Sequence, residues 1–190
     1  MSSETSVRLI PHPADAPSPL RAVHVGVRRD AARLELRFRL AGDLARVRVP
    51  AAAAPSFTLG LWEHTCVEAF VAADGALAYH ELNLSPSSEW AAFAFSDFRT
   101  PEALLGDVKA PRLATRTDGD ALALDVTVAL ESLAPAYSVA ALWLGLSAVV
   151  EATDGSRSYW SLVHPKSYPD FHLRSTRTLR LAAPRSESEP

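Results

Sequence analysis

Aromatic, carboxylate and amide side chains are concentrated between residues 61 and 99 of this chain. If this stretch forms paired strands, strand alternation places a group of them on one outer face of a sheet. The group consists of Trp62, His64, Glu68, Tyr79, Glu81 and Asn83. Such a face suits a sugar, because its C–H face stacks on an aromatic ring while its hydroxyls bond to carboxylates and amides. The alternative is a face covered by a loop, where the same polar groups are buried and satisfied within the protein.

A second candidate segment is HPKSYPDFH, residues 164–172. Its two prolines favour a rigid loop over one end of the fold, where it could line a pocket and bring His164 to the same site. The alternative is a crossing loop that is fastened by its own polar groups.

Catalytic and metal sites are weakly indicated. His64, Cys66 and Glu68 alternate along one expected strand, but their spacing matches no recognised zinc pattern, and a buried structural cysteine is the commoner role. Glu68 and Glu81 on adjacent strands would lie about 5 Å apart, as in a retaining glycosidase. Neighbouring strands produce that separation without catalysis, and no G-x-S-x-G motif is present. We therefore predict no catalytic residue and no metal ligand.

The tryptophans divide into two groups. Trp62 lies beside charged residues at the start of an expected strand, which favours an exposed ring that a ligand can stack on. The other three lie in apolar strands and are expected in the core: Trp90, Trp143 and Trp160.

The elements that must position these residues are strands. Apolar residues alternate clearly at 22–29 and 33–40, and the central stretch predicts strands at about 63–72, 78–85 and 89–98. Further strands are expected at about 7–12, 111–117, 121–129, 137–152, 158–163 and 174–181. Gly-containing turns separate several of these runs, as at Asp74-Gly75. About ten short strands predict an all-β fold, an antiparallel β-sandwich of jelly-roll type with at most short helical turns.

Length and composition restrict the remaining possibilities. A chain of 190 residues favours one domain, expected over residues 1–183, with residues 184–190 as a disordered tail. The net charge of −3 and the absence of a Lys/Arg cluster argue against a nucleic-acid partner. No apolar run approaches the ~18 residues of a membrane span, and the N-terminus does not match a signal peptide, so we expect a cytoplasmic protein with no membrane partner. The single cysteine rules out an internal disulfide.

The segments LWEHTCVEAFV and YHELNLSPSSEW resemble DOMON-like domains, specifically those similar to the family 9 carbohydrate-binding module. The matching positions are Trp62, Val67, Glu68, Phe70, Tyr79, Glu81, Asn83 and Pro86. The late segment YWSLVHPKSYPDFH is similar to a bacterial DOMON-like subgroup. The resemblance implies a β-sandwich that binds a sugar or a heme, although a fold alone does not determine function.

Two departures from that pattern affect the expected ligand. The carbohydrate modules carry an acidic residue just before V-E, where this chain has His64 and Thr65. The heme-binding relatives use Met and His ligands, and the only methionine here is Met1. A heme held by histidine alone has these candidate ligands: His64, His80, His164 and His172. We predict a non-enzymatic module that binds a small-molecule ligand, a sugar; the alternatives are a heme-binding or redox module and an interaction domain without a small ligand.

Overall fold

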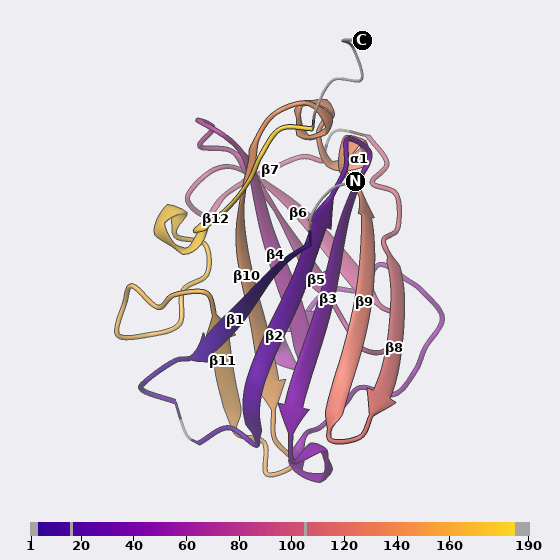
Figure 1. Cartoon of the computed structure of the whole chain (residues 1–190), viewed down its shortest axis with the longest axis vertical. Coiled ribbons are helices and arrows are strands. Elements are labelled where there is room, and N and C mark those ends of the chain that lie inside the picture. The colour runs from indigo at the N-terminus through magenta and orange to yellow at the C-terminus, as the bar shows by residue number, and fades with distance from the viewer. Residues whose placement is uncertain (1–3, 16, 105, 185–190) are drawn as a thin grey trace.

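Two antiparallel sheets pack face to face in the computed structural model, which describes residues 4–15, 17–104 and 106–184 (Figure 1). The first sheet has the strand order β1-β2-β3-β9-β8. Its strands are β1 (Thr5–Pro11), β2 (Leu20–Arg29), β3 (Arg33–Gly42), β9 (Ala121–Ala129) and β8 (Arg112–Asp118). Every pairing is antiparallel, as the sequence predicts.

The second sheet has the order β7-β6-β5-β4-β10-β11, with β12 also paired to β10. Its strands are β4 (Cys66–Ala73), β5 (Tyr79–Leu84), β6 (Trp90–Asp97), β7 (Thr100–Glu102), β10 (Leu142–Glu151), β11 (Arg157–Ser161) and β12 (Leu179–Leu181). β1 joins the two sheets, because its first residues pair with β2 while Ile10 and Pro11 pair with β11.

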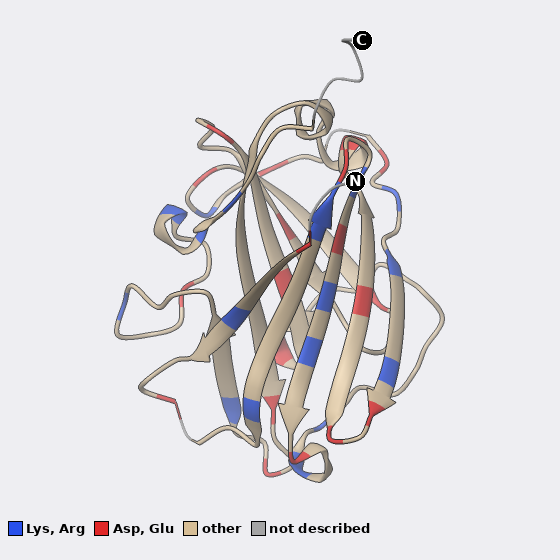
Figure 2. Ribbon diagram, in the orientation of Figure 1, with Lys and Arg blue, Asp and Glu red and all other residues tan. Residues whose placement is uncertain are grey.

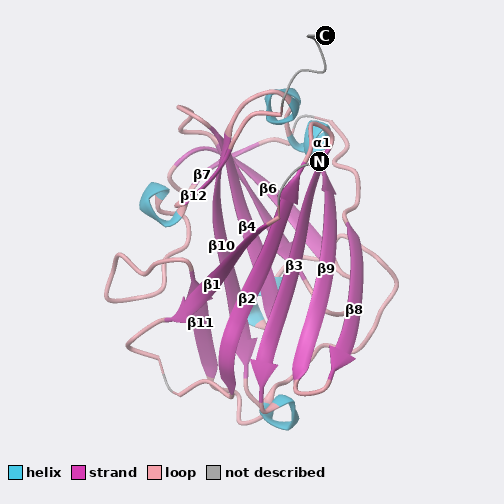
Figure 3. Cartoon of the chain, in the orientation of Figure 1, coloured by secondary structure: helices cyan, strands magenta, loops and turns pink. Residues whose placement is uncertain are grey.

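Over the described residues, helical structure is confined to single turns (Figure 3). These are α1 (Leu130–Leu133) and 3₁₀ turns at Leu44–Arg46, Leu61–Glu63, Pro135–Ser138 and Arg174–Thr176. The prediction of an all-β sandwich is thereby confirmed. Within the described ranges, no helix has the length and hydropathy needed to cross a membrane.

The largest differences in strand limits occur at two of the expected strands, which are shorter in the structure. The strand predicted at 137–152 begins at Leu142, because the chain forms a 3₁₀ turn at Pro135–Ser138 first. The strand predicted at 174–181 is reduced to Leu179–Leu181 by the turn at Arg174–Thr176. Of the tail expected at 184–190, only Pro184 belongs to the described residues.

The core lies between the sheets and is built from alternate residues of each strand. Val25 and Phe38 of the first sheet and Val71 and Leu82 of the second are at most 1% exposed and belong to one apolar cluster. Basic and acidic residues are interspersed along the strands of the first sheet (Figure 2). The expected core faces of β4 and β5 are confirmed, because Val67, Val71, Leu82 and Leu84 all join this cluster.

The opposite face of the second sheet is also largely covered. Cys66 and Phe70 of β4, Tyr79 of β5 and Val149 of β10 form a separate apolar cluster together with Phe171. Phe171 belongs to the segment between β11 and the turn at Arg174–Thr176. We call residues 164–173 the covering segment. It makes a second packed layer over part of this face, and the candidate site lies beside it.

Candidate functional site

A pocket of about 520 Å³ opens on the outer face of the second sheet. Residues of β4, β5 and β10 face it from the middle of the sheet: Glu68, Phe70, Glu81 and Val149. The rest of the lining comes from β6 and the turn after it, from β11, from the turn before β4 and from the covering segment. These residues are Trp62, Phe93, Phe95, Arg99, Arg157, Tyr159, Pro169, Asp170, Phe171 and His172. Its volume falls within the range of small-molecule sites, about 300–1,000 Å³.

Strand register determines which polar groups meet at the floor. Glu68 on β4 lies opposite Asn83 on β5 and Ser147 on β10, whereas Glu81 lies opposite Phe70. Glu68 and Glu81 are therefore diagonal neighbours and not the directly opposed pair that the 5 Å expectation assumed. Diagonal neighbours lie about 7–8 Å apart at the backbone, within reach of long side chains.

Glu68 is the most deeply placed carboxyl group of the pocket, with 4% of its surface exposed. Its Oε2 accepts a hydrogen bond from the Ser147 hydroxyl at 2.8 Å. Burial, together with the nearby charge of Glu81, raises the pKa of Glu68 from 4.5 to about 8 and outweighs the opposing effect of Ser147. At neutral pH Glu68 therefore holds its proton and has a hydroxyl that can donate.

Glu81 is bound more tightly by its neighbours. Its Oε1 accepts from the Asn83 amide at 2.8 Å, and its Oε2 lies 3.5 Å from Nε2 of His172. Burial raises the pKa of Glu81, while the Asn83 hydrogen bond and the charge of Arg99 act in the opposite direction. Glu81 is thus held in one orientation at the floor of the pocket.

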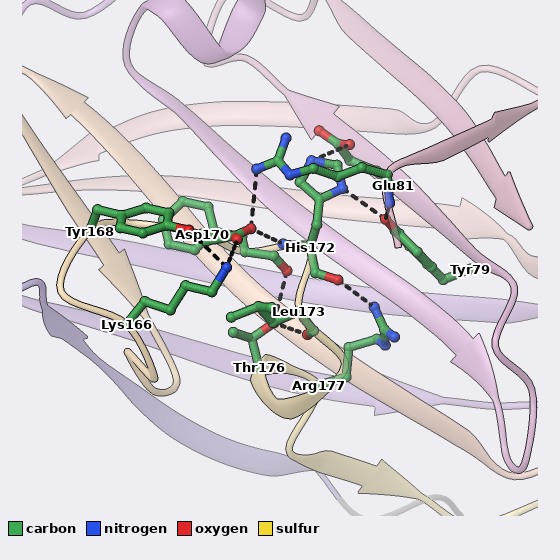
Figure 4. Close-up of polar contacts among 11 residues, drawn as sticks. Tyr79, Glu81, Lys166, Tyr168, Asp170, His172, Leu173, Thr176 and Arg177 are labelled. Carbon is green, nitrogen blue, oxygen red and sulfur yellow. Dashed lines mark hydrogen bonds and ion pairs between the residues drawn. The ribbon is translucent and has the colours of Figure 1, made fainter. Parts of the chain in front are cut away.

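His172 connects the covering segment to the sheet (Figure 4). Its Nδ1 lies 2.9 Å from the Tyr79 hydroxyl, so both ring nitrogens face protein groups. Burial lowers the pKa of His172 to about 4, with the charge of Arg99 adding to the effect. The ring is therefore neutral at physiological pH and keeps a single N–H.

Asp170 is the second attachment of the covering segment (Figure 4). It accepts from Lys166 at 2.9 Å and from Arg99, which follows β6, at 3.1 Å. Burial alone would raise the pKa of Asp170, but these two hydrogen bonds outweigh burial and lower it. Asp170 therefore remains ionised and holds the segment at the edge of the pocket.

Aromatic rings form much of the pocket wall. Trp62 is 41% exposed and meets Phe93 edge to face, with ring centroids 5.9 Å apart. Tyr159 on β11 meets Phe171 at a centroid distance of 6.3 Å. Apolar rings thus surround a floor that carries two carboxyl groups.

The structure brings together some of the predicted site residues and separates others. Trp62, Glu68 and Glu81 line the pocket. Tyr79 and Asn83 are 1% and 0% exposed, so they support the lining through their bonds to His172 and Glu81 without facing the pocket.

The two predicted histidines lie outside the lining. His64 precedes β4, and its Nδ1 lies 2.8 Å from Oε2 of Glu151. His164 directs its Nε2 to the carbonyl of Ile10 at 2.9 Å. Trp62 itself lies in the turn Leu61–Glu63, because β4 begins later than the predicted strand.

Several lining residues were not singled out by the sequence. Phe93 and Phe95 could have been found, because alternation along β6 places them beside Glu81 and Tyr79. Arg157 and Tyr159 could not, since nothing local indicates that β11 joins the sheet two strands away from β4.

Neither a metal nor a heme fits the groups present. Among the described residues, no cluster of three His, Cys, Asp or Glu side chains is arranged to hold a metal ion. Of the candidate heme ligands, His172 uses both ring nitrogens within the protein, and His80 is bonded to the Tyr137 hydroxyl at 2.9 Å. His64 and His164 do not face the pocket. The described histidines therefore offer this pocket no free axial ligand.

Comparison with known proteins gives matches at the level of structure. No protein-family model matches the sequence, and no curated protein matches it significantly. A candidate carbohydrate-binding protein from Bacteroides uniformis superimposes with a TM-score of 0.62 at 13% identity, over 90% of this chain and 83% of that one.

Two further structures are family 9 carbohydrate-binding modules from Caldicellulosiruptor kristjanssonii. The module in complex with glucose has a TM-score of 0.58 at 11% identity, over 92% of this chain and 82% of that one. The module in complex with cellotriose has a TM-score of 0.55 at 12% identity, over 90% and 80%. At these identities the similarity establishes a shared fold.

Proposed function

We propose that this chain is a sugar-binding module and that the pocket on the second sheet is its binding site. The observation that carries the proposal is a floor of two buried carboxyl groups beneath an open wall of aromatic rings. Every sugar hydroxyl can both donate and accept, so it is best matched by a mixed set of polar groups. The protonated Glu68 can donate, and Glu81 can accept.

Trp62 is the expected stacking platform. Its ring is 41% exposed and borders the pocket, so it is accessible to a ligand. A sugar lying against the indole would direct its hydroxyls toward the polar floor. The glucose and cellotriose complexes of proteins with the same fold support this ligand class.

The carboxyl groups are assigned a binding role. Each is fixed by a hydrogen bond from the protein, Glu68 by Ser147 and Glu81 by Asn83. A carboxyl group has further lone pairs, so each can also bond to a ligand.

Isothermal titration calorimetry tests the proposal with glucose, galactose, xylose and their disaccharides. At least one of these should bind the wild-type protein, and Trp62→Ala should weaken that binding by about tenfold or more, which corresponds to about 1.4 kcal/mol of lost contact. Phe57→Ala is the matched control, because Phe57 is 49% exposed and lies outside the lining. Thermal melting checks that both variants fold. Absence of binding across the panel would refute the proposal, and unchanged affinity in Trp62→Ala would remove Trp62 from the site.

A further inference from the structure

We infer that this pocket selects sugars bearing an anionic group, uronic acids in particular, and that Arg157 is the residue that recognises the anion. The inference rests on the proposed sugar-binding function and specifies its substrate class. It derives from the distribution of charged side chains around the pocket.

Arg157 reaches the pocket from β11 and is exposed. Its partner across the strand pair is Glu151, but that carboxylate is already engaged by Arg48 at 3.1 Å and by His64 at 2.8 Å. Within the described part of the chain, the side chain of Arg157 has neither a hydrogen bond nor an ion pair. Arg157 therefore lines the pocket with the donors of its guanidinium group available.

Arg99 adds positive charge at another part of the rim, beyond the end of β6. Its ion-pair partner Asp170 also binds Lys166, so two cations share one carboxylate. This cluster keeps an excess of one positive charge beside the pocket.

The floor can offset at most one of these positive charges. Glu68 is neutral at pH 7, because burial raises its pKa to about 8, and His172 is neutral because burial lowers its pKa to about 4. Glu81 is the remaining acid of the floor, and it is bound by Asn83 and lies next to His172. Arg99, Lys166 and Arg157 carry three positive charges, and Asp170 and Glu81 offset at most two of them, so at least one positive charge remains around the pocket.

A carboxylate is well matched to a free guanidinium, since two parallel N–H donors can bind its two oxygens. A uronic acid offers that carboxylate where the parent hexose has a hydroxymethyl group. The remaining hydroxyls of the two sugars are the same, so the pair isolates the contribution of the charge.

Calorimetry with two matched pairs tests the inference: glucuronic acid against glucose, and galacturonic acid against galactose. One uronate should bind the wild-type protein about tenfold more tightly than its neutral partner at low ionic strength, which is the scale of one charge-assisted hydrogen bond. Added salt should reduce this preference, because Arg157 is exposed.

The variant Arg157→Gln should bring the uronate to the affinity of its neutral partner while leaving the neutral sugar unchanged. Arg157→Lys should keep part of the preference, because it retains the charge without the paired donors. Arg112→Gln on β8 is the control, since Arg112 is exposed on the first sheet and is absent from the pocket lining. Glucose 6-sulfate serves as a second anionic probe, and loss of its binding in Arg157→Gln would also support recognition of an anion.

The possible failures are distinct. Equal or weaker binding of both uronates, with neutral sugars still bound in a Trp62-dependent way, would overturn the inference and leave the proposed function standing. A uronate preference that persists in Arg157→Gln would overturn the role of Arg157. Failure of every sugar to bind would refute the proposed function itself.

Discussion

Replacing Glu68 by Gln is expected to stabilise the protein at neutral pH, which is an unusual result for a buried hydrogen-bonded residue. The substitution keeps the shape of the side chain and an oxygen that can accept from Ser147. It removes the ionisation. Because burial and Glu81 raise the pKa of Glu68 from 4.5 to about 8, the folded protein holds this proton more tightly than the unfolded chain does.

The sign and size of the effect follow from that difference in pKa. Below pH 4.5 Glu68 is protonated in both the folded and the unfolded state, so it does not change the free energy of unfolding. As the pH rises toward 8, only the unfolded chain loses the proton. The free energy of unfolding therefore falls over this range. Each pKa unit corresponds to about 1.4 kcal/mol, so the wild-type protein should lose about 5 kcal/mol over this window and about 3 kcal/mol of it by pH 7. Glu68→Gln should escape that loss.

Urea unfolding of both proteins from pH 4.5 to pH 8.5 measures the effect. The two unfolding free energies should be similar at the acid end, and the variant should become progressively more stable as the pH rises. Glu102→Gln on the exposed strand β7 is the control and should run parallel to the wild type. If Glu68→Gln also runs parallel to the wild type, Glu68 is ionised in the folded protein and our description of the pocket floor is wrong.

Two further predictions concern the covering segment. Tyr79→Phe removes the hydroxyl next to Nδ1 of His172 and leaves this partly buried ring nitrogen without its partner. We therefore expect a loss of about 1–3 kcal/mol in unfolding free energy, against less than about 0.5 kcal/mol for the exposed control Tyr168→Phe. An unchanged stability of Tyr79→Phe would show that this contact contributes little. Asp170→Asn removes the negative charge that binds both Arg99 and Lys166. Because this charge holds the covering segment, amide hydrogen exchange over residues 164–173 should become faster in the variant, while exchange in the β2–β3 pair should stay the same. Equal exchange in the two proteins would mean that Asp170 does not hold the segment.

Much of the fold could be predicted from local patterns. Alternation identified the core face of β4 and β5, because one-residue steps send side chains to opposite faces wherever a strand is formed. The same pattern correctly put Glu68 and Glu81 on the other face. Strand limits were harder, because Gly60 adopts a left-handed conformation (φ 81°) and is followed by a 3₁₀ turn that carries Trp62.

The far side of the pocket could not be predicted, because it depends on contacts between distant parts of the chain. β10 lies next to β4 and β11 lies next to β10, although both are far from β4 in sequence. Only these pairings bring Tyr159 and Arg157 to the same pocket as Glu68. The covering segment combines the two alternatives that its sequence suggested. Lys166 and Asp170 fasten it internally, while Phe171 and His172 line the pocket.

The question whether the polar face is open or covered also has a mixed answer. Glu68 and Glu81 are only 4% and 7% exposed, as expected under a covering loop. A pocket of about 520 Å³ nevertheless remains above them, with Trp62 at its edge. The two carboxyl groups are therefore buried, although the pocket above them is open.

The most direct test of the central claim is a crystal structure of the protein soaked in the sugar that calorimetry selects. We predict electron density for a sugar ring against Trp62, with hydroxyls within hydrogen-bonding distance of Glu68 and Glu81. Density for the sugar at another surface, with this pocket empty at a saturating concentration, would contradict the account.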